Sequence, residues 1–193
     1  REKNGIFGLI GESETTTFKD TNIEPDLDIT PPRQRDPFRG TDNYPGTSSY
    51  YEQRRVFGGS RNKPDTAWYS QIAAQNNMSV SSPTQDDDAI TATLNALEVN
   101  EIRHFVPLTD LIVLTSGSEW RVNSSQDAAF SASTLKQKPQ SYWGSSHRKP
   151  IVAGNTVLFV QENAAAVRSL GYSLQIDSYT GSEMSLLASH LFQ

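Results

Sequence analysis

The sequence predicts a mainly β protein whose hairpins form the blades of a partial β-propeller. The main observation is a His-x-x-Pro motif that begins at His104 and occurs again at His147. Each motif is followed by a short apolar run, at 111–114 and 157–160. The two histidines lie 43 residues apart, and His190 lies 43 residues further along the chain. A fixed period of this length indicates repeated supersecondary units, and in an all-β chain it is close to one propeller blade.

The amino-acid composition favours many short strands joined by polar turns. Hydrophobic residues make up 35% of the 193 residues, against roughly 45–50% in an average globular protein counted with glycine. Charged residues make up only 20%, so Ser, Thr, Asn and Gln supply the difference. The net charge of −5 argues against a protein whose main task is to bind nucleic-acid phosphates. It is compatible with a channel through which nucleic acid passes without specific binding.

Cysteine is absent from the sequence, which excludes disulfides and thiolate chemistry in this chain. No apolar stretch approaches the roughly 18–20 residues of a membrane span, so we expect none. The chain starts at Arg1 rather than at methionine, and we expect it to be a piece of a longer protein. Its length suits one domain together with a fragment of another.

The first part of the chain differs in pattern from the rest. Small and apolar residues alternate over 5–11, and a second apparent strand over 15–18 is followed by turn residues. We expect these to be the last strands of a small β-sandwich. Pro31-Pro32 favours extended polyproline conformation, which predicts a linker. Residues 1–32 are therefore predicted to be the end of a β-sandwich with a Pro-rich linker, and residues 33–193 an incomplete set of blades.

The remainder is predicted to consist of hairpins, with few helices. Turn residues separate apolar, β-branched and aromatic segments throughout this part. Weak helical patterns occur over 99–106, as a single turn, and over 182–189, as a short C-terminal helix. The three predicted hairpins pair 50–57 with 66–69, 111–115 with 119–122, and 156–161 with 166–170.

Two groups of residues suggest metal chemistry, and in each the pattern favours a simpler role. The run Asp86-Asp87-Asp88 offers carboxylates of the kind that Ca²⁺ binds, but it lacks the ligand spacing and the glycine of a calcium loop. We expect a solvated loop there. Imidazole is a common metal ligand and general base. However, equivalent positions on successive blades lie around a ring, so we expect the three histidines to stay apart and to serve structure.

The sequence contains no motif of a common catalytic or cofactor site. A GxSxG elbow, an HExxH pair, a Walker A loop and a GxGxxG fingerprint are all absent. Gly58-Gly59 and Gly117 are expected to be turn glycines rather than a phosphate cradle. We therefore expect a protein that is not an enzyme, with no catalytic, cofactor-binding or metal-binding residues, no cofactor and no small-molecule substrate.

A region rich in arginine and aromatic residues is the strongest candidate for an interface. Arginine near aromatic side chains can stack on bases or pair with carboxylates of another protein. Because the chain is acidic overall, we expect a subunit or interdomain contact in preference to nucleic-acid binding. The region comprises Arg33, Arg35, Arg39, Arg54, Arg55, Arg61, Phe38, Tyr44, Tyr50 and Tyr51.

The three tryptophans have two interpretations. Trp68, Trp120 and Trp143 offer rings for a sugar site. Two of them lie in predicted strands, where burial in the core is the default, and we expect the core role there.

Long motifs occur along nearly the whole chain, at YPGT in 44–47, YYEQRRVFGGS in 50–60, SPTQDDDAI in 82–90, VNEIR in 99–103, LTSGSEWRV in 114–122, and over 150–172. These segments resemble the tail proteins of short-tailed bacteriophages and their prophages, in particular the nozzle, or tail tubular protein B-like, component. The resemblance covers nearly the whole chain.

This resemblance implies a structural subunit of the virion tail, made in the cytoplasm of the bacterial host. Such a subunit contains a β-propeller and forms a ring through which the genome is ejected, in contact with other tail proteins and with copies of itself. The resemblance also implies that residues 1–32 end a fibronectin-like insert, and it brings no catalytic residues. Three hairpins are fewer than the four to eight blades that usually close a propeller, so either missing parts complete the ring or the array is open.

The alternative is a carbohydrate-binding or carbohydrate-cleaving propeller that acts on the bacterial surface. Cleavage needs two carboxyl groups roughly 5–10 Å apart. The spacing along the chain brings no such pair together. The carboxylates available for it are Asp86, Asp87, Asp88, Asp110, Glu119 and Asp177. A calcium-dependent adhesion module is a third alternative.

Overall fold

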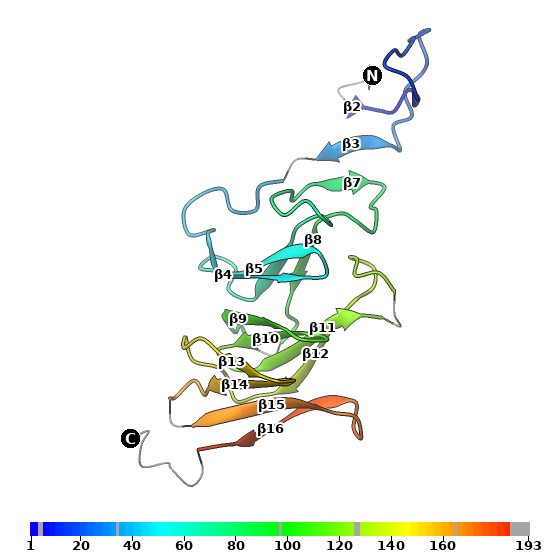
Figure 1. Ribbon diagram of the computed structural model, residues 1–193. Coiled ribbons are helices and arrows are strands. Elements are labelled where there is room, and N and C mark those ends of the chain that lie inside the picture. The colour runs from blue at the N-terminus through cyan, green and yellow to red at the C-terminus, as the bar shows by residue number, and fades with distance from the viewer. Residues whose placement is uncertain (4–5, 34, 97, 126–127, 165, 186–193) are drawn as a thin grey trace.

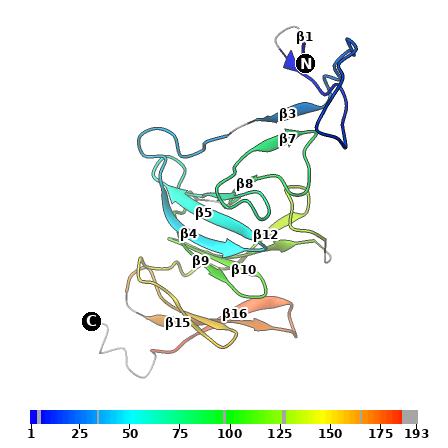
Figure 2. The same ribbon diagram turned by 45° about the horizontal axis from the view of Figure 1, so that its top comes forward.

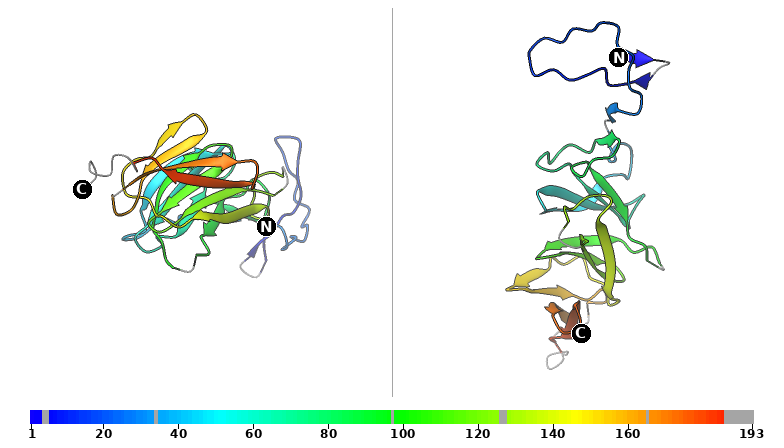
Figure 3. Two further views of the ribbon diagram at one scale, coloured as in Figure 1. Left: turned by 90° about the horizontal axis from the view of Figure 1, so that it is seen from below. Right: turned by 90° about the vertical axis from the view of Figure 1, so that its right-hand side faces the viewer.

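The computed structural model describes residues 1–193 except for 4–5, 34, 97, 126–127, 165 and 186–193. The described residues form only β-structure, with three four-stranded antiparallel sheets and two small two-stranded ones, and no helix. The predicted mainly β class is confirmed. The three large sheets, which we call sheets I, II and III, lie one above another in chain order (Figure 1; Figure 3, right).

Each large sheet is built from strands that are near neighbours in sequence. Sheet I has the order β4 (Pro45–Tyr51), β5 (Arg54–Ser60), β6 (Thr66–Tyr69) and β8 (Ile90–Thr93). Sheet II contains β9 (Ile102–Pro107), β10 (Leu111–Thr115), β11 (Glu119–Ser124) and β12 (Leu135–Ser141). Sheet III contains β13 (Ile151–Ala153), β14 (Thr156–Val160), β15 (Val167–Ser173) and β16 (Ser178–Glu183). Every neighbouring pair is antiparallel, so each sheet is a four-stranded meander.

The central strand β10 of sheet II is buried on both faces. Successive side chains of a strand point to opposite faces of the sheet. Leu111 and Val113 accordingly belong to a core shared with sheet I, where they join Val56 and Tyr69 among others. Ile112 and Leu114 point to the opposite face, where a second core lies. Together the two cores explain why the run from Leu111 to Leu114 is apolar at every position rather than at alternate ones.

On the other face of sheet II, Ile112 and Leu114 pack with Phe159 and Leu170 of sheet III. All four β10 side chains from Leu111 to Leu114 are 0% exposed. Sheet II is therefore a middle layer whose two faces hold the outer sheets.

The predicted helical patterns are wrong where the structure describes them. Phe105 and Val106 lie in β9 and face opposite cores. Both are therefore apolar although they are adjacent in a strand, and this gave the sequence a helix-like spacing of apolar residues. Ser182 and Glu183 belong to strand β16. The end of the predicted C-terminal helix, at 186–189, lies outside the described residues.

Two of the three predicted hairpins are confirmed by their strand registers. In the second, Leu111 pairs with Val122 and Leu114 with Glu119, across the turn that contains Gly117. In the third, β14 pairs with β15 from Thr156 to Val160. Apolar runs on either side of turn residues, with a turn glycine in the second hairpin, were sufficient to predict these pairings.

The first hairpin is only partly as predicted. The pairing of β5 with β6 is confirmed, for example by Val56 opposite Tyr69. The predicted strand 50–57 is in fact two strands, β4 and β5, joined by a two-residue turn at Glu52 and Gln53. These residues have φ angles of 47° and 58°, in the left-handed region that Asn and Gly usually supply in such turns. The absence of those residues hid the turn in the sequence.

Gly58 and Gly59 lie inside strand β5 and not in a turn, which corrects their predicted role. A Cβ atom on Gly58 would clash with the ring of Phe105, and one on Gly59 with the carbonyl oxygen of Ile102. Gly59 also has a φ angle of +65°. The glycine pair thus allows sheet II to approach sheet I closely.

The beginning of the chain forms only short strands, at the end of the molecule farthest from sheet III (Figure 1; Figure 3, right). β1 (Glu2–Lys3) pairs with β2 (Ile6–Phe7), and Leu9 forms an isolated bridge with Asp26. The strand predicted over 15–18 is not formed. Whether residues 1–32 end a fibronectin-like sandwich stays a prediction.

A strand occupies the segment where a Pro-rich linker was predicted. β3 (Thr30–Arg33) pairs with β7 (Val80–Ser82), which lies in the long connection between β6 and β8 (Figure 2). This pairing joins residues on both sides of the boundary predicted near Pro32. The division of the chain into 1–32 and 33–193 stays a prediction.

Arg54, at the start of β5, is fully buried with 0% exposure. Its Nη1 donates to the carbonyl oxygens of Ser70 at 2.8 Å and Asp88 at 2.5 Å. Its Nη2 donates to those of Asp86 at 2.6 Å and Phe130 at 3.1 Å. A guanidinium carries five N–H donors in a fixed plane. The one side chain of Arg54 therefore holds both the β6–β8 connection and the β11–β12 connection against sheet I. The predicted interface role of Arg54 is therefore wrong.

Replacing Arg54 is expected to destabilise the fold strongly. Arg54→Met keeps most of the side-chain length but leaves several buried carbonyl groups without a donor, so the free energy of unfolding should fall by about 3–5 kcal/mol. Urea denaturation followed by tryptophan fluorescence measures this change. The neighbouring Arg55 is only half-buried and stacks over Phe57, so Arg55→Met should cost about 1 kcal/mol or less. Equal losses for the two variants would contradict the role of Arg54.

Candidate functional site

The two ends of the stack of sheets differ in how their faces are covered. The outer face of sheet I carries Phe57 and Trp68, which are opposite each other on β5 and β6. Phe38 covers them, with ring centroids 5.0 Å and 5.5 Å away in edge-to-face geometry. Arg55 lies over the same Phe57 ring at 4.8 Å. The segment before β4 thus closes this end of the stack.

The outer face of sheet III has no such cover among the residues that the structure describes. Because Val157 and Phe159 point into the core, the alternate side chains of β14, Leu158 and Val160, point outward. Ile151 on β13 pairs with Leu158, and Val167 on β15 pairs with Val160. We call these four residues, Ile151, Leu158, Val160 and Val167, the open face. Ile151 is 66% exposed and the other three are partly exposed.

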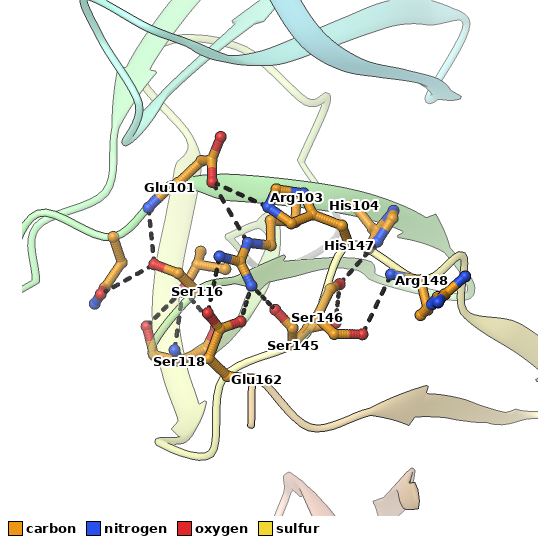
Figure 4. Close-up of polar contacts among 12 residues, drawn as sticks. Glu101, Arg103, His104, Ser116, Ser118, Ser145, Ser146, His147, Arg148 and Glu162 are labelled. Carbon is orange, nitrogen blue, oxygen red and sulfur yellow. Dashed lines mark hydrogen bonds and ion pairs between the residues drawn. The ribbon is translucent and has the colours of Figure 1, made fainter. Parts of the chain in front are cut away.

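On one side of the stack, Arg103 of sheet II binds the β12–β13 connection and the β14–β15 turn (Figure 4). Its Nη1 donates to the carbonyl oxygen of Ser145 at 2.6 Å, and its Nη2 donates to Glu162 at 3.0 Å. Its Nε lies 3.4 Å from the carboxylate of Glu101. The Arg103 side chain is only 9% exposed, whereas those of Glu101 and Glu162 are 47% and 44% exposed, so these charge-assisted bonds are only partly shielded from water.

Two of the histidines meet at this junction, which corrects the expectation that all three stay apart (Figure 4). The Nε2 atom of His104 lies 3.2 Å from the carbonyl oxygen of Ser146, and the His147 ring lies 3.8 Å from the carboxylate of Glu101. Burial lowers the pKa of His104, and the nearby charge of His147 lowers it further. The connection between β12 and β13 folds back towards β9, so equal spacing in sequence did not separate the two rings. His190 lies outside the described residues.

Within the described part of the chain, no three His, Asp or Glu side chains are grouped so as to hold a metal ion. Of the acidic run, Asp86 and Asp87 are exposed as predicted. Asp88 is buried and accepts hydrogen bonds from the backbone N–H groups of Ser81 at 2.9 Å and Gln85 at 2.8 Å. The run thus shapes a loop, and only two of its three residues are solvated.

The remaining carboxylates are arranged in two places. Asp110 and Asp177 both pair with Arg121, at 2.8 Å and 3.0 Å, although sequence spacing gave no reason to expect them together. Glu119, the first residue of β11, is fully buried and accepts hydrogen bonds from the Ser141 hydroxyl and from the Trp143 N–H. Burial raises the pKa of Glu119.

The region of arginine and aromatic residues predicted as an interface is divided by the fold. Arg54 is buried and Phe38 belongs to the cover of sheet I. Tyr44 and Tyr50 stay exposed, at 69% and 54%. The core role expected for two tryptophans is confirmed by Trp68 and Trp120, with 2% and 3% exposure.

A scan against models of known protein families and a search of curated proteins found no match to this chain. In the described part of the chain, no helix has the length and apolar character needed to cross a membrane.

The buried Glu119 predicts an unusual dependence of stability on pH. A carboxyl group whose pKa is raised on folding costs stability above its unfolded pKa of about 4.5, and this cost disappears at lower pH, where both states are protonated. Glu119→Gln is therefore expected to raise the unfolding midpoint near pH 7 and to lose this advantage as the pH falls towards about 4. Thermal unfolding of both proteins across this range measures the difference.

Glu98 offers a matched control, because it is exposed. Glu98→Gln should change the unfolding midpoint little at either pH. A Glu119→Gln variant that is less stable than the unmodified chain near pH 7 would show that its hydrogen bonds outweigh the cost of burial, against this prediction.

Proposed function

We propose that this chain is part of a structural subunit of a short-tailed bacteriophage tail, of the nozzle or tail tubular protein B-like kind. Its blades belong to a ring in the virion that surrounds the path of the ejected genome and contacts other tail proteins. The chain acts by assembly and not by catalysis. The residues quoted for the resemblance to phage tail proteins are one support for this proposal.

The observation that carries the proposal is the order of the three sheets. Each is an antiparallel meander of four strands, and each packs face to face on the next in chain order. Consecutive blades of a β-propeller have this arrangement. Propellers usually close with four to eight blades, so under this proposal the three sheets are part of a propeller whose array continues beyond sheet III.

The open face indicates where the array continues. Its four apolar residues lie on the outward side of sheet III, while the outer face of sheet I is already covered by Phe38. An apolar sheet face gains stability when another sheet excludes water from it. The occupant is a further four-stranded blade of the same tail subunit, packed as sheet III packs on sheet II.

The net charge also fits a conduit. A chain with a charge of −5 repels the phosphates of DNA more than it attracts them. Genome that passes beside such a protein is not retained by it.

Electron microscopy of the full-length tail subunit tests this proposal, together with a charge placed on the open face. The unmodified subunit is expected to form symmetric rings. Leu158→Asp puts a carboxylate where the next blade packs, so it should reduce the fraction of rings in the images severely.

Val99→Asp is the matched control, because Val99 is 72% exposed and lies outside sheet III. This variant should form rings as the unmodified subunit does. Unmodified subunits that stay monomeric at every concentration, with other tail proteins present, would refute the proposed function. Normal rings from Leu158→Asp would refute the role of the open face.

A further inference from the structure

A polar cleft of about 750 Å³ opens where the ends of the three large sheets meet. Sheet I contributes Tyr51, sheet II contributes Arg121 and Asn123, and sheet III contributes Tyr172 and Tyr179. The volume falls within the range of about 300–1,000 Å³ that is typical of ligand sites. The proposed assembly of blades makes no use of this cleft.

Two partly exposed tyrosine rings, Tyr51 and Tyr172, give the cleft its aromatic surface. Tyr172 and Tyr179 pack edge to face with centroids 5.4 Å apart, and Tyr51 packs against Phe130 at 5.3 Å. These contacts hold Tyr51 and Tyr172 in place, while Tyr179 is only 2% exposed and supports the Tyr172 ring. Fixed aromatic rings with polar groups around them suit a ligand that has both C–H faces and hydroxyl groups.

The charges in the cleft are largely paired with one another. Arg121 binds Asp110 at 2.8 Å and Asp177 at 3.0 Å, and its guanidinium lies 5.4 Å from the centre of the Tyr172 ring. The place of a cation against this ring is therefore already filled by the protein. Glu52 adds a further carboxylate to the lining, so the cleft has an excess of negative charge and disfavours anionic ligands.

Uncharged hydrogen-bonding groups complete the lining. Among the residues that the structure describes, the side-chain amides of Asn123 and Asn155 line the cleft without a hydrogen-bond partner. Each amide offers two donors and an acceptor. Such groups match the hydroxyl groups of a polyol, which also donate and accept.

We infer that this cleft binds an uncharged saccharide. The rings of Tyr51 and Tyr172 contact the C–H faces of the sugar, the two asparagine amides hydrogen-bond its hydroxyl groups, and the Arg121 ion pairs orient the Tyr172 ring. Hydrogen bonds from Tyr172 and Arg121 lower the pKa of Asp177, which keeps that group ionised.

Ligand-observed NMR with neutral trisaccharides built from glucose, galactose or N-acetylglucosamine tests the inference, with a sialylated trisaccharide as the anionic comparison. At least one neutral trisaccharide is expected to receive saturation from the protein, and the sialylated one to receive less. Asn123→Ala and Tyr172→Leu should each weaken binding at least about tenfold, which corresponds to about 1.4 kcal/mol.

Tyr142→Leu is the matched control, because Tyr142 is 73% exposed and lies outside the cleft. This variant should bind as the unmodified chain does. Thermal unfolding shows which variants are folded, and Asn123→Ala keeps the test decisive if Tyr172→Leu is not. Absence of binding by all neutral trisaccharides, binding that survives Asn123→Ala, or stronger binding of the sialylated sugar would overturn the inference. None of these results bears on ring formation by the tail subunit.

Discussion

The structure depends on the burial of β10 from both sides. Four consecutive side chains, from Leu111 to Leu114, have no exposed surface, and they alternate between the core with sheet I and the core with sheet III. Full burial of one such side chain contributes about 1.5–3 kcal/mol. Neither outer sheet has a second large sheet of its own to pack against among the described residues. The middle sheet therefore holds the stack together and fixes the orientation of the elements that form the cleft and the open face.

Much of the fold could be predicted from the sequence, because apolar runs between turn residues identify central strands. The β10–β11 and β14–β15 hairpins are of this kind. The turn at Glu52 and Gln53 could not, since neither residue type favours the left-handed conformation that both adopt. Burial of Arg54 was missed for a similar reason, because arginine is almost always a surface residue and its partners are main-chain carbonyl groups.

The candidate site was harder to predict than the fold, since its parts come from separate sheets. Tyr51, Arg121 and Tyr172 are unremarkable in the sequence, and only the stacking of the sheets brings them to one cleft. The signal that was available is the pair Tyr172 and Tyr179, which flanks one hairpin turn and faces the same side of sheet III. The open face and the cleft use different residues, so assembly and recognition of a saccharide can occur in the same subunit.

Hydrogen exchange of the isolated chain, measured by mass spectrometry, tests the central role of the middle sheet most directly. Amides that open only on global unfolding exchange last. The peptide that contains Leu111–Thr115 is expected to be the slowest, followed by peptides of β14 and β5, which each border one core, and β13 is expected to exchange early. Exchange of β10 as fast as that of β13 would contradict the view that the middle sheet holds the three sheets together.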